Sequence, residues 1–271
     1  MRDPSAPVIS VVIPCYQEAA RVASAIAGYR ACVQALGLKS ELILVDDGST
    51  DGTTERANSL MVGQDELRCI SVRHAGKGAA LRTGIEAASG AWIVLADADW
   101  SMSPDQTPAL LPAETGEEIG ASKGVMIGCR EHTHSRRIGE PFYRHFLGRC
   151  FNHLVRLLLV PGVSDTQCGF KGLSAQTGKK LCLLTEESGW AFDVELLLLA
   201  RRAGQPVIPV PIRWEYDPDS RVSALRDSIL MGLALIRIGF RHGFRTGREP
   251  VSAKAGDTCP PDGSVGPGLQ P

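Results

Sequence analysis

Long apolar runs and paired cysteines are both missing from this 271-residue sequence. No stretch reaches the roughly 18–20 uncharged apolar residues that cross a bilayer as a helix, and the N-terminal MRDPSAPVIS has no apolar segment of the secretory kind. The eight cysteines form no CxxC pair, and Cys15, Cys69 and Cys129 lie in or at the end of apolar runs, where reduced thiols are buried as small hydrophobes. We therefore expect a cytoplasmic protein, neither secreted nor transmembrane.

An excess of charge of one sign and the common nucleotide-binding signatures are also missing. The chain has 29 basic and 30 acidic residues, a net charge of -1, which argues against a basic surface for nucleic acid. No GxxxxGK[ST] loop occurs and no GxGxxG follows the first strand-like run, which disfavours P-loop enzymes and Rossmann dinucleotide enzymes. With 44% hydrophobic residues, the composition is that of a globular protein with one substantial core.

Strand-like and helix-like segments alternate along the chain. Apolar β-branched runs typical of strands occur at 8–14, 41–47, 68–73 and 91–97. Segments with helical apolar spacing lie between them, such as 18–36 and 77–89. Further strands are expected at 124–129 and 206–214, and further helices near 140–160, 192–203 and 223–242. This order predicts a single α/β domain with a mainly parallel sheet flanked by helices. In such folds, ligands bind at the carboxyl ends of the strands.

Two aspartates one residue apart, Asp97 and Asp99, follow the fourth strand-like run in LADADWS. If the extended backbone continues through Ala98, both side chains project to the same side. Such a pair suits a hard divalent cation such as Mg²⁺, which completes its shell with phosphates and water. The competing interpretation is that these acids only end a strand and cap the next helix. Acidic residues also follow the first two strand-like runs, in PCYQE and VDDGSTDGT, which favours the cation site.

The loops after the second and third strand-like runs combine glycines with polar side chains. In VDDGSTDGT we assign Asp51 to helix capping, whereas Asp47 at the strand end is placed to accept hydrogen bonds from a base or from ribose hydroxyls. In HAGKG, Lys77 lies at a helix start, where backbone N–H groups and the helix dipole favour anions. A solvated basic helix end explains Lys77 taken alone equally well.

Four segments of the N-terminal half carry a family resemblance: ISVVIPCYQEAARV, LVDDGSTDGT, GKGAALRTG and DAD. They are similar to glycosyltransferase family 2, the inverting nucleotide-sugar transferases of GT-A fold. Four later segments are GVSDTQCGFKGLS, GWAFDVELLLLARRAG, VPIRW and SRVSALRDS. These resemble the branch that glycosylates polyprenyl phosphates, with dolichyl-phosphate glucosyltransferases nearer than dolichyl-phosphate mannose synthases. The resemblance covers roughly residues 8–245, and it implies the Rossmann-like GT-A fold.

The resemblance also implies roles for individual residues. Asp97 and Asp99 would bind Mg²⁺ or Mn²⁺, with Asp99 the more direct ligand. Arg130 and Arg221 would meet the diphosphate or the acceptor phosphate. The nucleotide pocket would be formed by Pro14, Tyr16, Glu18, Val45, Asp47 and Asp97, together with Lys77. The donor sugar and acceptor site would include Asp165, Gln167 and Lys171, although Lys171 fits a surface position on its strand equally well.

A phosphate acceptor would remove the need for a general base, because a phosphate monoester with a second pKa of ~6 is already ionised at neutral pH. His74 is the only histidine near a site motif. Asp193 is the best base candidate, since family members with hydroxyl acceptors have an acidic residue in a similar place, but it is equally explained as a helix N-terminal acid. Mannose synthases can place a glutamine two residues after the DxD pair as a further metal ligand, whereas this chain has Ser101.

Two arginine-rich segments, 136–160 and 221–245, mix basic residues with aromatic and aliphatic ones. Both are typical of amphipathic helices that lie on anionic lipid, although ordinary core-facing helices with charged outer residues fit as well. We expect peripheral attachment to the cytoplasmic face of a membrane. The expected organisation is an N-terminal arm at 1–7, a GT-A domain at 8–220, a C-terminal amphipathic helix region at 221–247 and a disordered tail at 248–271.

These inferences give one functional hypothesis and two alternatives. The hypothesis is inverting transfer of a hexose, glucose before mannose, from UDP-glucose or GDP-mannose to polyprenyl phosphate. The first alternative replaces the lipid with a soluble hydroxyl-bearing acceptor, such as a secondary metabolite or a cell-wall sugar. The second is a nucleotide-sugar-binding protein without turnover, which the presence of both the DxD pair and the DTQCGFK segment disfavours.

Overall fold

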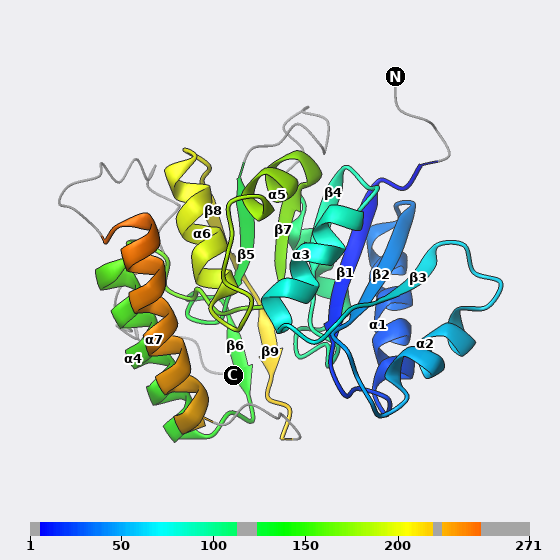
Figure 1. Ribbon diagram of the computed structural model, residues 1–271, viewed down its shortest axis with the longest axis horizontal. Coiled ribbons are helices and arrows are strands. Elements are labelled where there is room, and N and C mark those ends of the chain that lie inside the picture. The colour runs from blue at the N-terminus through cyan, green and yellow to red at the C-terminus, as the bar shows by residue number, and fades with distance from the viewer. Residues whose placement is uncertain (1–5, 113–123, 219–223, 245–271) are drawn as a thin grey trace, which may run out of the picture.

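Seven strands form one sheet in the order β3-β2-β1-β4-β7-β5-β8 (Figure 1). The computed structural model describes residues 6–112, 124–218 and 224–244, with the backbone alone for 224–229. The strands are β1 Ile9–Cys15, β2 Ser40–Asp46, β3 Leu67–Ser71, β4 Trp92–Leu95, β5 Val125–Cys129, β7 Lys171–Ser174 and β8 Val207–Pro211. Neighbouring strands pair parallel, except that β7 is antiparallel to both β4 and β5. A second, small sheet pairs β6 Arg136–Ile138 with β9 Arg213–Glu215 in parallel.

Helices cover both faces of the large sheet. The helices α3 Lys77–Ala87, α5 Ala175–Cys182 and α6 Phe192–Arg202 contact one another in front of the sheet in Figure 1, and α1 Val22–Leu36 lies behind it. The 3-10 helix η1 Pro104–Leu110 contacts α1, and α2 Thr53–Met61 packs beside β3. The helices α4 Phe142–Leu158 and α7 Ala224–His242 lie side by side at the β8 end of the sheet. The predicted single-domain, mainly parallel α/β fold is therefore confirmed.

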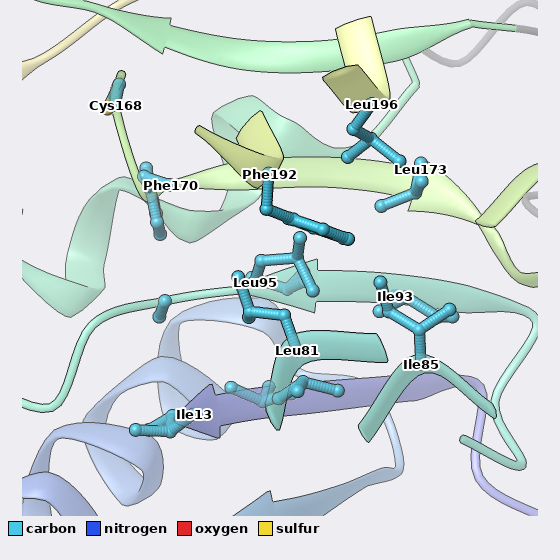
Figure 2. Close-up of a cluster of buried hydrophobic side chains, with 14 of the residues drawn as sticks. Ile13, Leu81, Ile85, Ile93, Leu95, Cys168, Phe170, Leu173, Phe192 and Leu196 are labelled. Carbon is cyan, nitrogen blue, oxygen red and sulfur yellow. The ribbon is translucent and has the colours of Figure 1, made fainter. Parts of the chain in front are cut away.

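The core lies on both faces of the sheet, against α1 behind it and against α3, α5 and α6 in front of it. Figure 2 shows Leu81 and Ile85 of α3 and Phe192 of α6 against Ile93 and Leu95 of β4, and all five side chains are at most 3% exposed. Burial of each such side chain stabilises the fold by about 1.5–3 kcal/mol. Because β1, β2 and β4 have helices on both faces, the central residues of each strand form a continuous apolar run, namely VVI, LILV and WIVL.

Two expected boundaries differ from the structure. The single strand predicted at 206–214 is wrong, because β8 ends at Pro211 and β9 begins at Arg213. Between them, the Ile212 N–H donates to Ser135 Oγ at 2.9 Å as the chain passes from the large sheet to the small one. The segment 136–160 is also not helical from its start, since its first three residues form β6 and α4 begins only after Pro141.

Three sequence expectations concern residues outside the described part of the chain. These are Arg221, the tail at 248–271 and the first five residues of the N-terminal arm. Within the described part, no helix combines the length and the apolar character needed to cross a bilayer.

Candidate active site

A cavity of about 660 Å³ opens at the carboxyl ends of β1, β2, β4 and β5. The sequence-predicted residues that line it are Pro14, Tyr16, Glu18, Asp47, Lys77, Asp97, Asp99, Arg130 and Gln167. The described candidates that do not line it are Val45, Asp165, Lys171 and Asp193. Val45 is fully buried within β2, where its side chain packs close to the backbone of α3 at Gly84. The strand ends thus bring most of the predicted residues together in one place.

Asp97 and Asp99 reach the cavity from a turn. The condition of an extended backbone through Ala98 is not met, because β4 ends at Leu95 and the turn includes both Ala98 and Asp99. Trp100 follows with a φ of 47°, which is uncommon for a residue other than glycine. Its indole Nε1 donates to a backbone carbonyl of α1 at 3.0 Å. This anchor fixes the turn that presents both carboxylates.

Positive charge surrounds Asp97. Its Oδ1 atom lies 2.5 Å from Nζ of Lys77, and Lys171 and Arg130 act on it from farther away. Burial would raise the pKa of Asp97, but these cations, Lys77 foremost, hold it below its ordinary value. Burial would lower the pKa of Lys77, but Asp97 raises it above its ordinary value. Asp97 and Lys77 therefore form an ionised pair at neutral pH.

The negative charge of Asp99 is less well balanced by nearby cations than that of Asp97. It accepts a hydrogen bond from the Ser101 N–H at 2.9 Å. Burial and the negative charge of Asp97 raise the pKa of Asp99 above its ordinary value. Among the described residues, no group of three or more His, Cys, Asp or Glu side chains is arranged to hold a metal ion. A hard cation held by these two carboxylates would therefore have to take its remaining ligands from phosphate and water.

Asp47 organises the loop that leads into α3. Its Oδ1 accepts from the N–H of Ala75 at 2.8 Å, and its Oδ2 accepts from the N–H of Gly76 at 2.9 Å. The Nδ1 atom of His74 also lies 2.8 Å from Oδ2, and the His74 ring stacks on Tyr16 at a centroid distance of 4.3 Å. Asp47 thus holds the segment that carries Lys77, while its predicted contact with the nucleotide stays a prediction.

Arg130 and Asp165 form a bidentate ion pair. The guanidinium donates from Nε to Oδ2 at 2.7 Å and from Nη2 to Oδ1 at 2.8 Å. Burial would raise the pKa of Asp165, but Arg130 lowers it to about 2. Asp165 is 1% exposed and its oxygens are directed to Arg130, so it positions the cation that lines the cavity. Nearby, the buried Nε2 of Gln167 has no hydrogen-bond partner among the described residues.

Lys171 and Asp193 form a second buried ion pair. The Nζ of Lys171 lies 2.7 Å from Oδ1 of Asp193 and also donates to the Cys168 carbonyl. The interpretation of Lys171 as a surface residue is wrong, because β7 lies between β4 and β5 and the side chain is fully buried. Asp193, on the first turn of α6, is 4% exposed. The pair ties the sheet to α6, and this geometry does not favour Asp193 as a base.

An aromatic and basic part of the lining was missed by sequence reasoning. The guanidinium groups of Arg130 and Arg137 lie 5.5 and 6.0 Å from the Trp214 ring centroid. Arg144 lies 5.2 Å from the Tyr216 ring and donates to its hydroxyl at 2.9 Å. The sequence pattern that could have revealed this part is WEY at 214–216, because alternation in an extended segment places the two aromatic side chains on one face. Further lining residues that the sequence did not single out include Arg21, Trp190 and Asp217.

Comparison with known proteins agrees with the fold and the motifs. Residues 10–176 match glycosyl transferase family 2. A dolichyl-phosphate beta-glucosyltransferase of Drosophila melanogaster is 33% identical over 247 residues, covering 86% of this chain and 75% of that protein. A dolichyl-phosphate beta-glucosyltransferase of Homo sapiens is 30% identical over 244 residues, with 86% and 75% covered.

A solved structure gives independent support for the fold. It is glucosyl-3-phosphoglycerate synthase from Mycobacterium tuberculosis in complex with Mn²⁺ and UDP-glucose. The TM-score is 0.60 at 22% identity, and the match covers 89% of this chain and 80% of that one. Together with the motifs and the sheet topology, these findings show that the chain belongs to glycosyl transferase family 2.

Proposed function

We propose that this protein transfers glucose from UDP-glucose to a polyprenyl phosphate, with inversion at the anomeric carbon. The observation that carries the proposal is the make-up of the cavity, which joins a carboxylate pair to arginines and then to apolar residues of α4 and α7. The names of the curated relatives support glucose over mannose and a polyprenyl phosphate over a soluble acceptor. GDP-mannose is the second candidate donor.

The carboxylate side of the cavity is the proposed donor site. The nucleoside would contact four residues that line this side of the cavity: Pro14, Tyr16, Glu18 and Asp47. Asp97 and Asp99 would hold Mg²⁺ or Mn²⁺, and such a cation supplies positive charge that stabilises the departing diphosphate. The Mn²⁺ in the structure of the Mycobacterium tuberculosis enzyme supports a divalent cation. Lys77 and Arg130 would add positive charge from the protein. Gln167 also lines the cavity, and its buried Nε2, which has no hydrogen-bond partner among the described residues, would donate to a sugar hydroxyl or a phosphate oxygen.

The arginine side of the cavity is the proposed acceptor site. Arg137 and Arg144 would bind the acceptor phosphate, which is mostly a dianion at neutral pH because its second pKa is ~6. An oxygen of this phosphate forms the bond to the anomeric carbon while the bond from that carbon to the diphosphate oxygen breaks. The electron pair leaves with UDP, and attack from the opposite side inverts the configuration. No proton moves, so the reaction needs no base.

Two neighbouring helices carry the apolar surface that a lipid substrate requires. Large exposed apolar side chains on them are Phe142, Tyr143, Phe146, Leu154 and Leu157 of α4, and Leu230, Leu233, Ile236 and Phe240 of α7. Basic residues such as Arg149 and Arg237 lie among them. We infer peripheral attachment to anionic lipid on the cytoplasmic face of a membrane. The described cysteines, all free thiols, agree with a reducing compartment.

The pH dependence of transfer tests whether the acceptor is a phosphate. With polyprenyl phosphate, kcat/KM is expected to rise with pH through about 6 and then level off, because the acceptor ionises there. The Asp193→Asn variant should keep this ascending limb. It should instead lose about 3–5 kcal/mol of unfolding free energy in urea titrations, because Lys171 is left buried without its counter-charge.

A double variant distinguishes a loss of folding stability from a loss of a catalytic base. Lys171→Met with Asp193→Leu removes both buried charges, so it should be more stable than Asp193→Asn and keep the same pH profile. If the ascending limb disappears in folded Asp193→Asn, Asp193 acts as a base. That result would favour a hydroxyl acceptor over a phosphate.

A further inference from the structure

Gly148 lies in the interior of α4 and lines the cavity. A glycine at such a position costs about 1 kcal/mol of helix stability relative to alanine. Glycine is often required in a helix because a neighbouring element approaches too closely for a side chain. That reason does not hold for Gly148, since a Cβ added there meets no atom within 4 Å. A side chain at this position would extend into open space beside the cavity.

The cavity lining changes from basic to apolar along one face of α4. Arg144 lies one turn before Gly148, and Phe151 lies about one turn after it, so the three share a face. Arg144 pairs with the Tyr216 hydroxyl in the polar part of the cavity. Leu147 and Phe151 of α4 and Met231 of the neighbouring α7 also line the cavity. Gly148 therefore marks the step from the basic part of the lining to the apolar part.

We propose that Gly148 keeps open the passage through which the first prenyl unit of the acceptor leaves the phosphate site. The inference rests on the proposed polyprenyl phosphate acceptor. With the phosphate near Arg144, the methyl-branched chain passes Gly148 and runs along α4 and α7 toward their exposed apolar side chains. The absence of a side chain at Gly148 thus determines how wide an acceptor chain the enzyme accepts.

Gly148→Leu tests the proposal with two chains of equal main-chain length. Farnesyl phosphate carries methyl branches, whereas dodecyl phosphate does not. In Gly148→Leu, kcat/KM for farnesyl phosphate is expected to fall about 10- to 100-fold, which is the usual effect of misfit in an apolar pocket. The inhibition constant of dodecyl phosphate against farnesyl phosphate, and the Kd of UDP, should each change by no more than about twofold.

Two variants serve as matched controls. Gly148→Ala adds one methyl group and should keep most of the activity. Gly232→Leu makes the same change in α7, where a Cβ also meets no atom within 4 Å but the residue does not line the cavity. Both leucine variants should unfold at the same temperature as wild type or higher, because leucine is a better helix former than glycine.

The outcomes separate this inference from the proposed function. If wild type uses no prenyl phosphate at all, the proposed function fails and the inference fails with it. If wild type uses prenyl phosphates and Gly148→Leu does so equally well, the inference alone is wrong. It is also wrong if Gly148→Leu weakens UDP and dodecyl phosphate binding as much as it lowers farnesyl transfer.

Discussion

Replacing Gly169 with alanine is expected to lower kcat about 100-fold in a protein that still folds. A Cβ at this position would lie 2.7 Å from Cγ of Asp97, with the carboxylate oxygens also in steric conflict. Lys77 holds the same carboxylate at 2.5 Å. Asp97 must therefore move, and a displacement of about 1 Å in a catalytic group is enough for a loss of this size.

The control for Gly169→Ala is Gly232→Ala, because the added methyl group there meets no atom within 4 Å. Steady-state kinetics with UDP-glucose and polyprenyl phosphate give kcat, and circular dichroism gives the unfolding temperature of each variant. We expect a large loss of kcat in Gly169→Ala and almost none in Gly232→Ala. Near-normal kcat in a folded Gly169→Ala protein would mean that the position of Asp97 is not critical.

Replacing Arg130 with lysine is expected to lower kcat/KM about 10²- to 10³-fold, although the charge is kept. Arg130 makes two parallel hydrogen bonds to Asp165, and its guanidinium lies over the Trp214 ring. Lysine has a single ammonium group, which can reproduce neither the paired hydrogen bonds nor the stacking. The positive charge would no longer be fixed against the reacting phosphates.

The loss in Arg130→Lys should not depend on pH in the neutral range. The folded-state pKa of Asp165, about 2, lies below its ordinary unfolded value, so the stabilisation by the ion pair is present above that unfolded value. It is lost only as the pH falls through about 2. Arg136→Lys, an exposed arginine on the small-sheet strand β6, is the matched control and should be near wild type. Equal activities of the two variants would remove Arg130 from the mechanism.

The positions of the site residues could largely be predicted from sequence. Apolar runs such as ISVVIPC and SELILVD predict buried parallel strands, and the carboxyl ends of such strands meet at one edge of the sheet. For that reason Asp47, Asp97 and Arg130, which follow three different strands, were expected together and do line one cavity. Their assigned roles toward donor and acceptor stay predictions.

The partners of the charged residues could not be predicted. Asp165 pairs with Arg130 across 35 residues of sequence, and Asp193 pairs with Lys171 across 22. Both pairings depend on the antiparallel strand β7 and the loop before it, and the four residues KGLS, with a charged first residue, are too short and too polar to predict a central strand. The turn at Asp99 likewise depends on Trp100, whose anchor lies 75 residues away in α1.

Transfer of labelled sugar into lipid tests the central claim most directly. Radiolabelled UDP-glucose and GDP-mannose would be incubated separately with polyprenyl phosphate and Mg²⁺ or Mn²⁺, with Asp99→Ala as control, and the butanol-extractable label counted. We expect label from UDP-glucose in the lipid phase, and its loss with EDTA or in Asp99→Ala. Metal-dependent hydrolysis of the donor without any lipid label would contradict the account and direct the search to soluble acceptors.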